Sequence, residues 1–129
     1  EAYVKTIQIE GKTALGMAKT MILPSALAYQ TQIAGTVCAV KAAEGDASVA
    51  AKTLKTLSAE IAAFNKGIDA LDKALNHHAE GDAYDHAKQC RDEVVPAMAE
   101  LRKHADALET MVSDDLWPIP TYREMLFMK

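Results

Sequence analysis

The chain has 129 residues and a net charge of -4; 50% of its residues are hydrophobic and 5% are aromatic. This composition fits one mainly helical domain with a sizeable core. The negative charge, without any cluster of lysine or arginine, argues against nucleic acid or an anionic membrane as a partner. No hydrophobic run reaches the length that a transmembrane helix needs.

Two cysteines, Cys38 and Cys90, are too few for a disulfide scaffold and indicate a reducing cytosol, so we expect a cytoplasmic protein. They fall near opposite ends of the helices expected below, which rules out a disulfide between them. No signal peptide precedes the helical pattern, and the chain opens at Glu1 without an initiator methionine. We therefore expect a piece of a longer protein.

Residues 3–41 predict a first long helix, because apolar residues recur along one side of the segment. Pro24 lies inside it and removes one backbone hydrogen bond, so we expect a kink near residues 21–25 or a break into two stacked helices. The first half also has a second apolar side, which indicates a contact with something besides the helical core. This second side consists of Tyr3, Ile9, Leu15, Met17 and Met21.

Residues 47–77 predict the second helix, which carries the strongest pattern in the chain. Before it, Gly45 suits the left-handed residue that ends a helix, and Asp46 or Ser48 suits the N-cap of the next. The apolar residues of the second helix are spaced alternately four and three apart and form one narrow stripe, which neighbouring segments must cover. The stripe consists of Ala50, Leu54, Leu57, Ile61, Phe64, Ile68, Leu71 and Leu75.

Gly81 and Asp82 repeat the stop and start signals, and residues 83–112 predict a third helix, kinked at Pro96. Short connections between long helices make neighbours antiparallel. The expected fold is therefore all-α: a single domain, residues 1–129, in which three long helices form an up-down-up antiparallel bundle.

The tail, residues 114–129, is the most apolar part of the chain, and Pro118 and Pro120 favour an extended course for it. Thr121 followed by Glu124 indicates a last short turn of helix. A segment of this composition is expected to dock, either along its own bundle near the first helix or on another part of a larger protein.

Signals for chemistry are weak. Gly11-Lys12-Thr13 resembles the end of a phosphate-binding loop, but that motif needs glycine at position 6, which is Thr6, and the neighbours are helical. We interpret Gly11 as room for a close helix crossing. No serine or cysteine has the surroundings of a catalytic nucleophile.

A metal site is conceivable where His86 and Cys90 lie one helical turn apart, with His77 and His78 in the preceding turn. Zinc needs three or four converging ligands, and Cys90 falls on the apolar stripe of the third helix, so we expect no metal here. Glu100 and His104 are four residues apart and are interpreted as a surface pair.

The two ends of the chain resemble a known family. The tail DDLWPIPTYREMLF, residues 114–127, resembles the C-terminal signature of type III glutamine synthetases, the long bacterial form of that enzyme. The opening YVKTIQIEGKT, residues 3–13, with Met17-Ala18 and Ile22-Leu23-Pro24, resembles the segment that follows the catalytic region in that family. The family more often has alanine where this chain has Gly11 and Ser25, which is a minor departure.

The resemblance implies that the whole protein is similar to enzymes that make glutamine from glutamate, ammonia and ATP with Mg²⁺, assembled as rings of identical subunits. The residues for that chemistry lie upstream in the family, so no catalytic, cofactor-binding or metal-binding residue is assigned to this chain. It would be a non-catalytic domain for packing, assembly or regulation, with the catalytic region of the same chain and neighbouring subunits as partners.

The residues expected at such an interface are Tyr3, Ile7, Met17, Met21, Leu116, Trp117, Ile119, Tyr122, Leu126 and Phe127. The alternative function is a free-standing helical interaction or sensor module without enzymatic activity, whose apolar stripe is completed by a partner helix.

Overall fold

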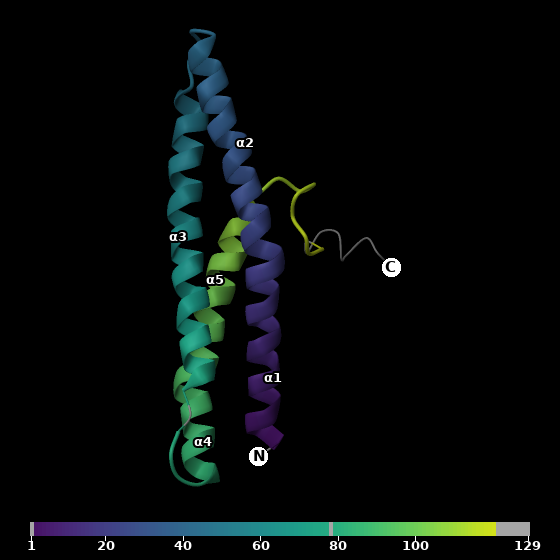
Figure 1. Cartoon of the computed structure of the whole chain (residues 1–129), viewed down its shortest axis with the longest axis vertical. Helices are drawn as coiled ribbons and strands as arrows, with labels where there is room; N and C mark the ends of the chain where they lie inside the picture. Colours follow the sequence, from purple (N-terminus) through teal and green to yellow (C-terminus); the bar gives the residue numbers. More distant parts are fainter. Residues whose placement is uncertain (1, 78, 121–129) are drawn as a thin grey trace.

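The computed structural model describes residues 2–77 and 79–120, which form three helical runs joined by two short connections (Figure 1). These residues contain no strand, which confirms the all-α class. None of their helices has the length and hydrophobicity needed to cross a membrane. The elements in order are α1 (Ala2–Met17), η1 (Ala18–Ile22), α2 (Leu23–Ala42), α3 (Ser48–Asn76), α4 (Ala83–Gln89), η2 (Cys90–Val94) and α5 (Val95–Met111).

The long helix α3 packs against both of the other helical runs, through α2 and α5. Figure 1 shows α1 and α2 following one another in a rod beside α3, while α4, η2 and α5 return along the lower part of α3. One buried hydrophobic core joins the three runs. Its members are Ala18, Ile22, Ala26, Leu57, Ile61, Phe64, Ile68, Leu71, Ala74, Leu75, Val94, Leu101, Leu108 and Val112.

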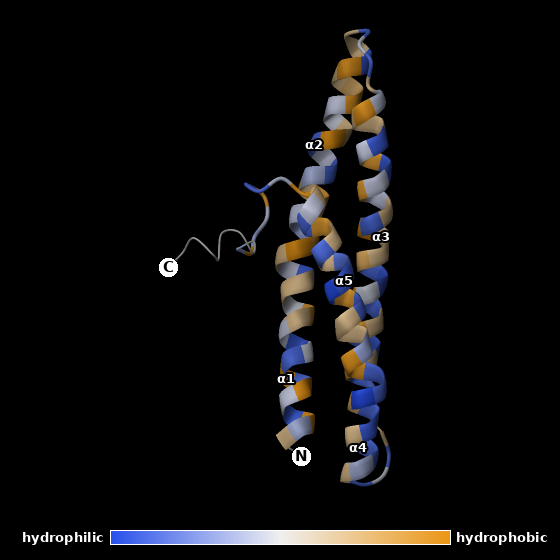
Figure 2. Ribbon diagram, turned by 180° about the vertical axis from the view of Figure 1, so that it is seen from behind, coloured by the Kyte–Doolittle hydropathy of each residue, from blue (hydrophilic) through white to orange (hydrophobic). Residues whose placement is uncertain are grey.

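The apolar stripe of α3 supplies much of this core, and hydrophilic and hydrophobic colours alternate along that helix in Figure 2. Six of its eight positions, from Leu57 to Leu75, are buried, whereas Ala50 and Leu54 are half-buried. Ala50 and Leu54 lie at the end of α3 where Figure 1 shows only α2 beside that helix. The stripe is therefore buried along the part of α3 that α5 also covers.

A π-helical turn precedes each internal proline. In η1 the N–H of Leu23 bonds to the carbonyl of Ala18, and in η2 the N–H of Val95 bonds to the carbonyl of Cys90. Pro24 and Pro96 follow directly. Proline lacks an N–H and its ring crowds the carbonyl four residues earlier, so a wider turn at this place accommodates it. The sequence does not predict these turns, and the kinks expected at the two prolines stay a prediction.

The first connection differs from the expected one. The left-handed residue is Glu44, with φ 61°, and not Gly45. The N–H of Gly45 bonds to the carbonyl of Val40 at 2.8 Å, and the N–H of Glu44 bonds to that of Lys41 at 3.0 Å. These two bonds are the Schellman motif, with Glu44 at the left-handed position that glycine usually takes and Gly45 one residue after it.

The starts of α3 and α4 use different caps. Ala47 is the N-cap of α3, so neither Asp46 nor Ser48 takes that position; the carboxylate of Asp46 instead accepts the Ser48 N–H at 2.9 Å. Asp82 is the N-cap of α4 as expected, and it forms a reciprocal capping box with Asp85. Gly81 before it has φ 118°, a conformation that favours glycine.

Gly11 lies where α1 crosses the other runs. A Cβ atom built on Gly11 would lie 2.8 Å from Cδ2 of Leu75 and 3.4 Å from Cγ1 of Val94. This confirms the interpretation of Gly11 as room for a close crossing.

The start of the tail packs on the bundle. Leu116 and Trp117 donate their N–H groups to the carbonyl of Ser113, at 3.0 and 3.1 Å, and so turn the chain after α5. Leu116, Trp117 and Ile119 then pack against the core. The expected short helical turn from Thr121 to Glu124 lies outside the described residues.

Candidate functional site

The described residues line a half-open cavity of about 630 Å³ between the first helical run, α5 and the segment after α5. Phe64 of α3 forms part of its interior. Most of the lining is apolar, and small side chains at Ala14, Ala18 and Ala105 leave the space open. Three charged side chains of α5 also border it: Arg102, Asp106 and Glu109.

The structure brings three of the expected interface residues together at this cavity. Met17, Trp117 and Ile119 line it, although the first is a hundred residues from the other two in sequence. Ile7 and Leu116 are half-buried and pack against the core but do not line the cavity. Tyr3 and Met21 are exposed instead. The remaining three candidates, Tyr122, Leu126 and Phe127, lie outside the described residues.

The indole nitrogen of Trp117 is a buried hydrogen-bond donor. Among the described residues, Nε1 of Trp117 has no hydrogen-bond acceptor although the atom is shielded from solvent. Buried polar groups in proteins nearly always have a partner, and a missing one costs free energy. Because this atom is shielded even from water, a molecule in the cavity does not reach it.

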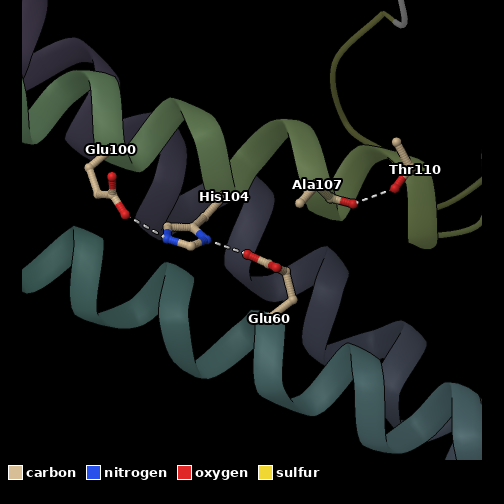
Figure 3. Close-up of polar contacts among 5 residues, drawn as sticks. All are labelled: Glu60, Glu100, His104, Ala107 and Thr110. Carbon is tan, nitrogen blue, oxygen red and sulfur yellow. Dashed lines mark hydrogen bonds and ion pairs between the residues drawn. The ribbon is translucent and has the colours of Figure 1, made fainter.

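A polar cluster links α3 to α5 (Figure 3). His104 contacts Glu60 through Nδ1 and Glu100 through Nε2, the latter at 3.0 Å. Its side chain is 18% exposed and that of Glu60 is 19% exposed. His104 and Glu100, expected as a surface pair, are thus part of a partly buried cluster that also includes Glu60. The sequence pattern does not predict Glu60, because it lies 44 residues from His104.

The candidate metal ligands face different partners. His86 contacts the carbonyl of Ala79 at 2.9 Å, and His77 contacts Glu93 at 2.7 Å. Cys90 is buried, and burial raises the pKa of its thiol. No group of three potential metal ligands converges among residues 2–77 and 79–120. His78 lies outside the described residues.

Two carboxyl groups have a lowered pKa because each accepts hydrogen bonds. The backbone N–H of Ser48 lowers the pKa of Asp46, and the side chain of His77 lowers the pKa of Glu93. Asp46 lies in the connection before α3 and Glu93 lies in η2, and both are exposed. The hydrogen bonds that cause these shifts stabilise the local structure around each carboxylate.

The geometry therefore defines a helical domain with an apolar cavity, and comparison with known proteins gives its family. A family model described as the glutamine synthetase C-terminal domain matches residues 1–41. The whole chain is 30% identical to a glutamine synthetase of Bacteroides fragilis (strain YCH46) and 32% identical to a type-3 glutamine synthetase of Dictyostelium discoideum. A glutamine synthetase of Butyrivibrio fibrisolvens is 30% identical over 98% of the chain.

The resemblance read from the two ends of the chain is confirmed: this chain corresponds to the C-terminal domain of glutamine synthetases. It spans 19% of the Bacteroides protein, 18% of the Dictyostelium protein and 19% of the Butyrivibrio protein.

Proposed function

We propose that this domain has no catalytic residues of its own and serves the packing and assembly of a type III glutamine synthetase. The observation that carries the proposal is a set of apolar side chains that the domain leaves uncovered on its first helical run. Tyr3 is 47% exposed, Ile9 is 64% exposed and Leu27 is 43% exposed. Exposed apolar surface of this kind is typical of a face that another protein surface covers.

The partners would be the catalytic region of the same chain and neighbouring subunits of a homo-oligomer. Tyr3 and Ile9 belong to the second apolar side of the first helix, and the core does not need them, since the stripe through Gly11 and Ala18 already faces α3 and η2. The domain would therefore present one side to its own core and the other to the rest of the enzyme.

The whole protein would make glutamine from glutamate, ammonia and ATP with Mg²⁺, in the cytoplasm, as a ring of identical subunits. ATP and Mg²⁺ would bind in the remainder of the enzyme. For the domain itself we propose the up-down-up antiparallel bundle, with a bend of the helix axis at Pro24 and at Pro96. The π-helical turns directly before both prolines support such bends.

The test uses the complete synthetase that carries this domain. Substituting Ile9→Asp together with Leu27→Asp should reduce the assembled fraction in sedimentation velocity, while the same double substitution in the isolated domain should leave its melting temperature nearly unchanged. Lys52→Asp, on an exposed position of α3, is the control and should leave assembly intact. Normal assembly of the doubly substituted enzyme would overturn the packing role, and glutamine formation by the isolated domain would overturn the lack of catalysis.

The same exposed side chains also suit a free-standing interaction module, which is the second candidate function. Sequencing the gene upstream of Glu1 separates the two. A catalytic region with glutamine synthetase motifs supports the domain of a synthetase, whereas a start codon or a membrane anchor directly before Glu1 supports the module.

A further inference from the structure

A second, polar cavity lies at the end of the bundle where the chain passes from α3 to α4, close to the start of α1. Its volume is about 390 Å³, within the range of roughly 300 to 1,000 Å³ that ligand pockets occupy. Four of the six described residues in its wall have polar side chains. The six are Val4, Gln8, His77, Ala79, His86 and Gln89.

The two histidines of this wall use one ring nitrogen each for a contact within the protein. Nδ1 of His77 contacts the carboxylate of Glu93 at 2.7 Å, and Nε2 of His86 contacts the carbonyl of Ala79 at 2.9 Å. Carboxylate and carbonyl oxygens accept hydrogen bonds, so the proton of each neutral ring lies on the contacting nitrogen. The other nitrogens, Nε2 of His77 and Nδ1 of His86, are therefore acceptors.

Gln89 has the same arrangement. Its side-chain Nε2 donates to the carbonyl of Ala74 at 3.0 Å and to Glu93 at 3.4 Å, although the residue is only 8% exposed. These two bonds fix the orientation of the amide and leave Oε1 as its free end. Glu93 thus receives an N–H group from both His77 and Gln89 and positions the two side chains.

The free acceptors can be reached from the cavity. In the described part of the chain, Nε1 of Trp117 is the only shielded side-chain nitrogen or oxygen without a partner. Oε1 of Gln89 and Nδ1 of His86 have no partner among those residues either, so both atoms must be open to solvent. Since both residues line the cavity, its occupant meets hydrogen-bond acceptors.

The charges around the cavity favour a cation. The C-terminal end of α3, where His77 is the C-cap, carries a partial negative charge. The positive N-terminal end of α4 is capped by the carboxylates of Asp82 and Asp85. The described wall contains no lysine or arginine. A zinc ion would need a third strong ligand beside His77 and His86, which the described wall lacks.

We propose that this cavity binds the primary ammonium group of a small organic amine. The N–H donors of that group match the free acceptors on His77, His86 and Gln89. The site goes beyond the packing role, because its wall contains neither Tyr3 nor Ile9 of the exposed apolar surface.

Methylammonium is the probe, and tetramethylammonium, which has the same charge but no N–H group, is its control. The complete chain, labelled with ¹⁵N, is titrated with each at about pH 8, where a histidine with the ordinary pKa of about 6.5 is neutral. The chain has four histidines, and the variants His77→Gln and His86→Gln assign their ring signals. Methylammonium should move Nε2 of His77 and Nδ1 of His86 upfield in a saturable way, and tetramethylammonium should not.

Two variants test the wall. Gln89→Met keeps the length of the side chain without its acceptor and should weaken methylammonium binding about fivefold to tenfold, the ratio that one hydrogen bond typically gives. Ala79→Leu places a larger side chain in the wall and should abolish binding. Gln32→Met, on an exposed position of α2, is the matched control and should leave binding unchanged.

Absence of a saturable shift at either ring nitrogen, an equal shift with tetramethylammonium, or unchanged binding by Gln89→Met would overturn the proposal. Should Gln89→Met fail to fold, as judged by far-ultraviolet circular dichroism, Ala79→Leu decides in its place, and binding that survives in that variant overturns the proposal.

Discussion

Gly67 of α3 faces Leu101 of α5 so closely that a Cβ atom built on Gly67 would lie 3.2 Å from Cδ1 of Leu101 and 3.5 Å from its Cα. Both residues are buried. We expect Gly67→Leu to lower the free energy of unfolding by about 1 to 3 kcal/mol, because the added side chain must push the two helices apart. Chemical denaturation measures the change.

Gly35 supplies the control for this substitution, since a Cβ built there meets nothing within 4 Å. Gly35→Leu should raise the free energy of unfolding by about 0.5 to 1 kcal/mol, since leucine favours a helix interior and glycine does not. If both variants change stability in the same direction, the close crossing at Gly67 does not limit packing.

Glu44→Gly should stabilise the chain. Glu44 takes the left-handed position of the Schellman motif, with φ 61°, which a side chain with a Cβ atom adopts at a cost. Glycine removes that cost, so the free energy of unfolding should rise by about 1 kcal/mol. Glu44→Ala removes the same charge but keeps the Cβ atom, and a gain of equal size in that variant would show that backbone strain is not the cause.

The His104 bridge should appear as a coupling energy between α3 and α5. Glu60 and His104 are both mostly buried at their side chains. In a double-mutant cycle of Glu60→Gln and His104→Gln, we expect a coupling of roughly 1 to 2 kcal/mol, since hydrogen bonds to charged groups are stronger than neutral ones. The cycle with Glu100, whose side chain is 56% exposed, should give less. Equal coupling in both cycles would contradict the interhelical bridge.

Acid should destabilise the contact between His77 and Glu93. The hydrogen bond from His77 lowers the pKa of Glu93 below its ordinary value of 4.5. A carboxyl group with a lowered folded-state pKa stabilises the fold above its unfolded-state pKa, and the effect is lost as the pH falls through the folded-state pKa. Stability measured from pH 6 downward should therefore decline less steeply in Glu93→Gln than in the parent chain. In a His77→Ala background the same substitution should change the slope little; an undiminished effect there would exclude His77 as the cause.

The apolar stripe of α3 should matter far more than its polar side. Leu57 is 0% exposed, and Leu57→Ala should lower the free energy of unfolding by about 2 to 5 kcal/mol, as expected for a buried leucine. Lys55, two residues earlier, is exposed, and Lys55→Ala should leave the melting temperature nearly unchanged. Similar losses in both variants would mean that the stripe does not face the core.

Features that depend on short stretches of chain were predictable from the sequence. The alternating spacing from Leu57 to Leu75 is a local pattern, and so is the start of α4 at Gly81 and Asp82, because periodicity and capping involve residues within one or two turns of each other. The residue order of the tail and of the opening segment was likewise enough to predict the family, and the matches to glutamine synthetases confirm that prediction.

Only the tertiary structure decided which residues meet across the helices. Glu60 contacts His104 from another helix, and Met17 and Trp117 line one cavity whose width depends on how α1 and α5 pack. The same packing leaves Ala50 half-buried while Leu57 in the same stripe is fully buried. Such contacts join positions far apart in sequence, and their distances follow from side-chain volumes at helix crossings, which no local pattern of residues specifies.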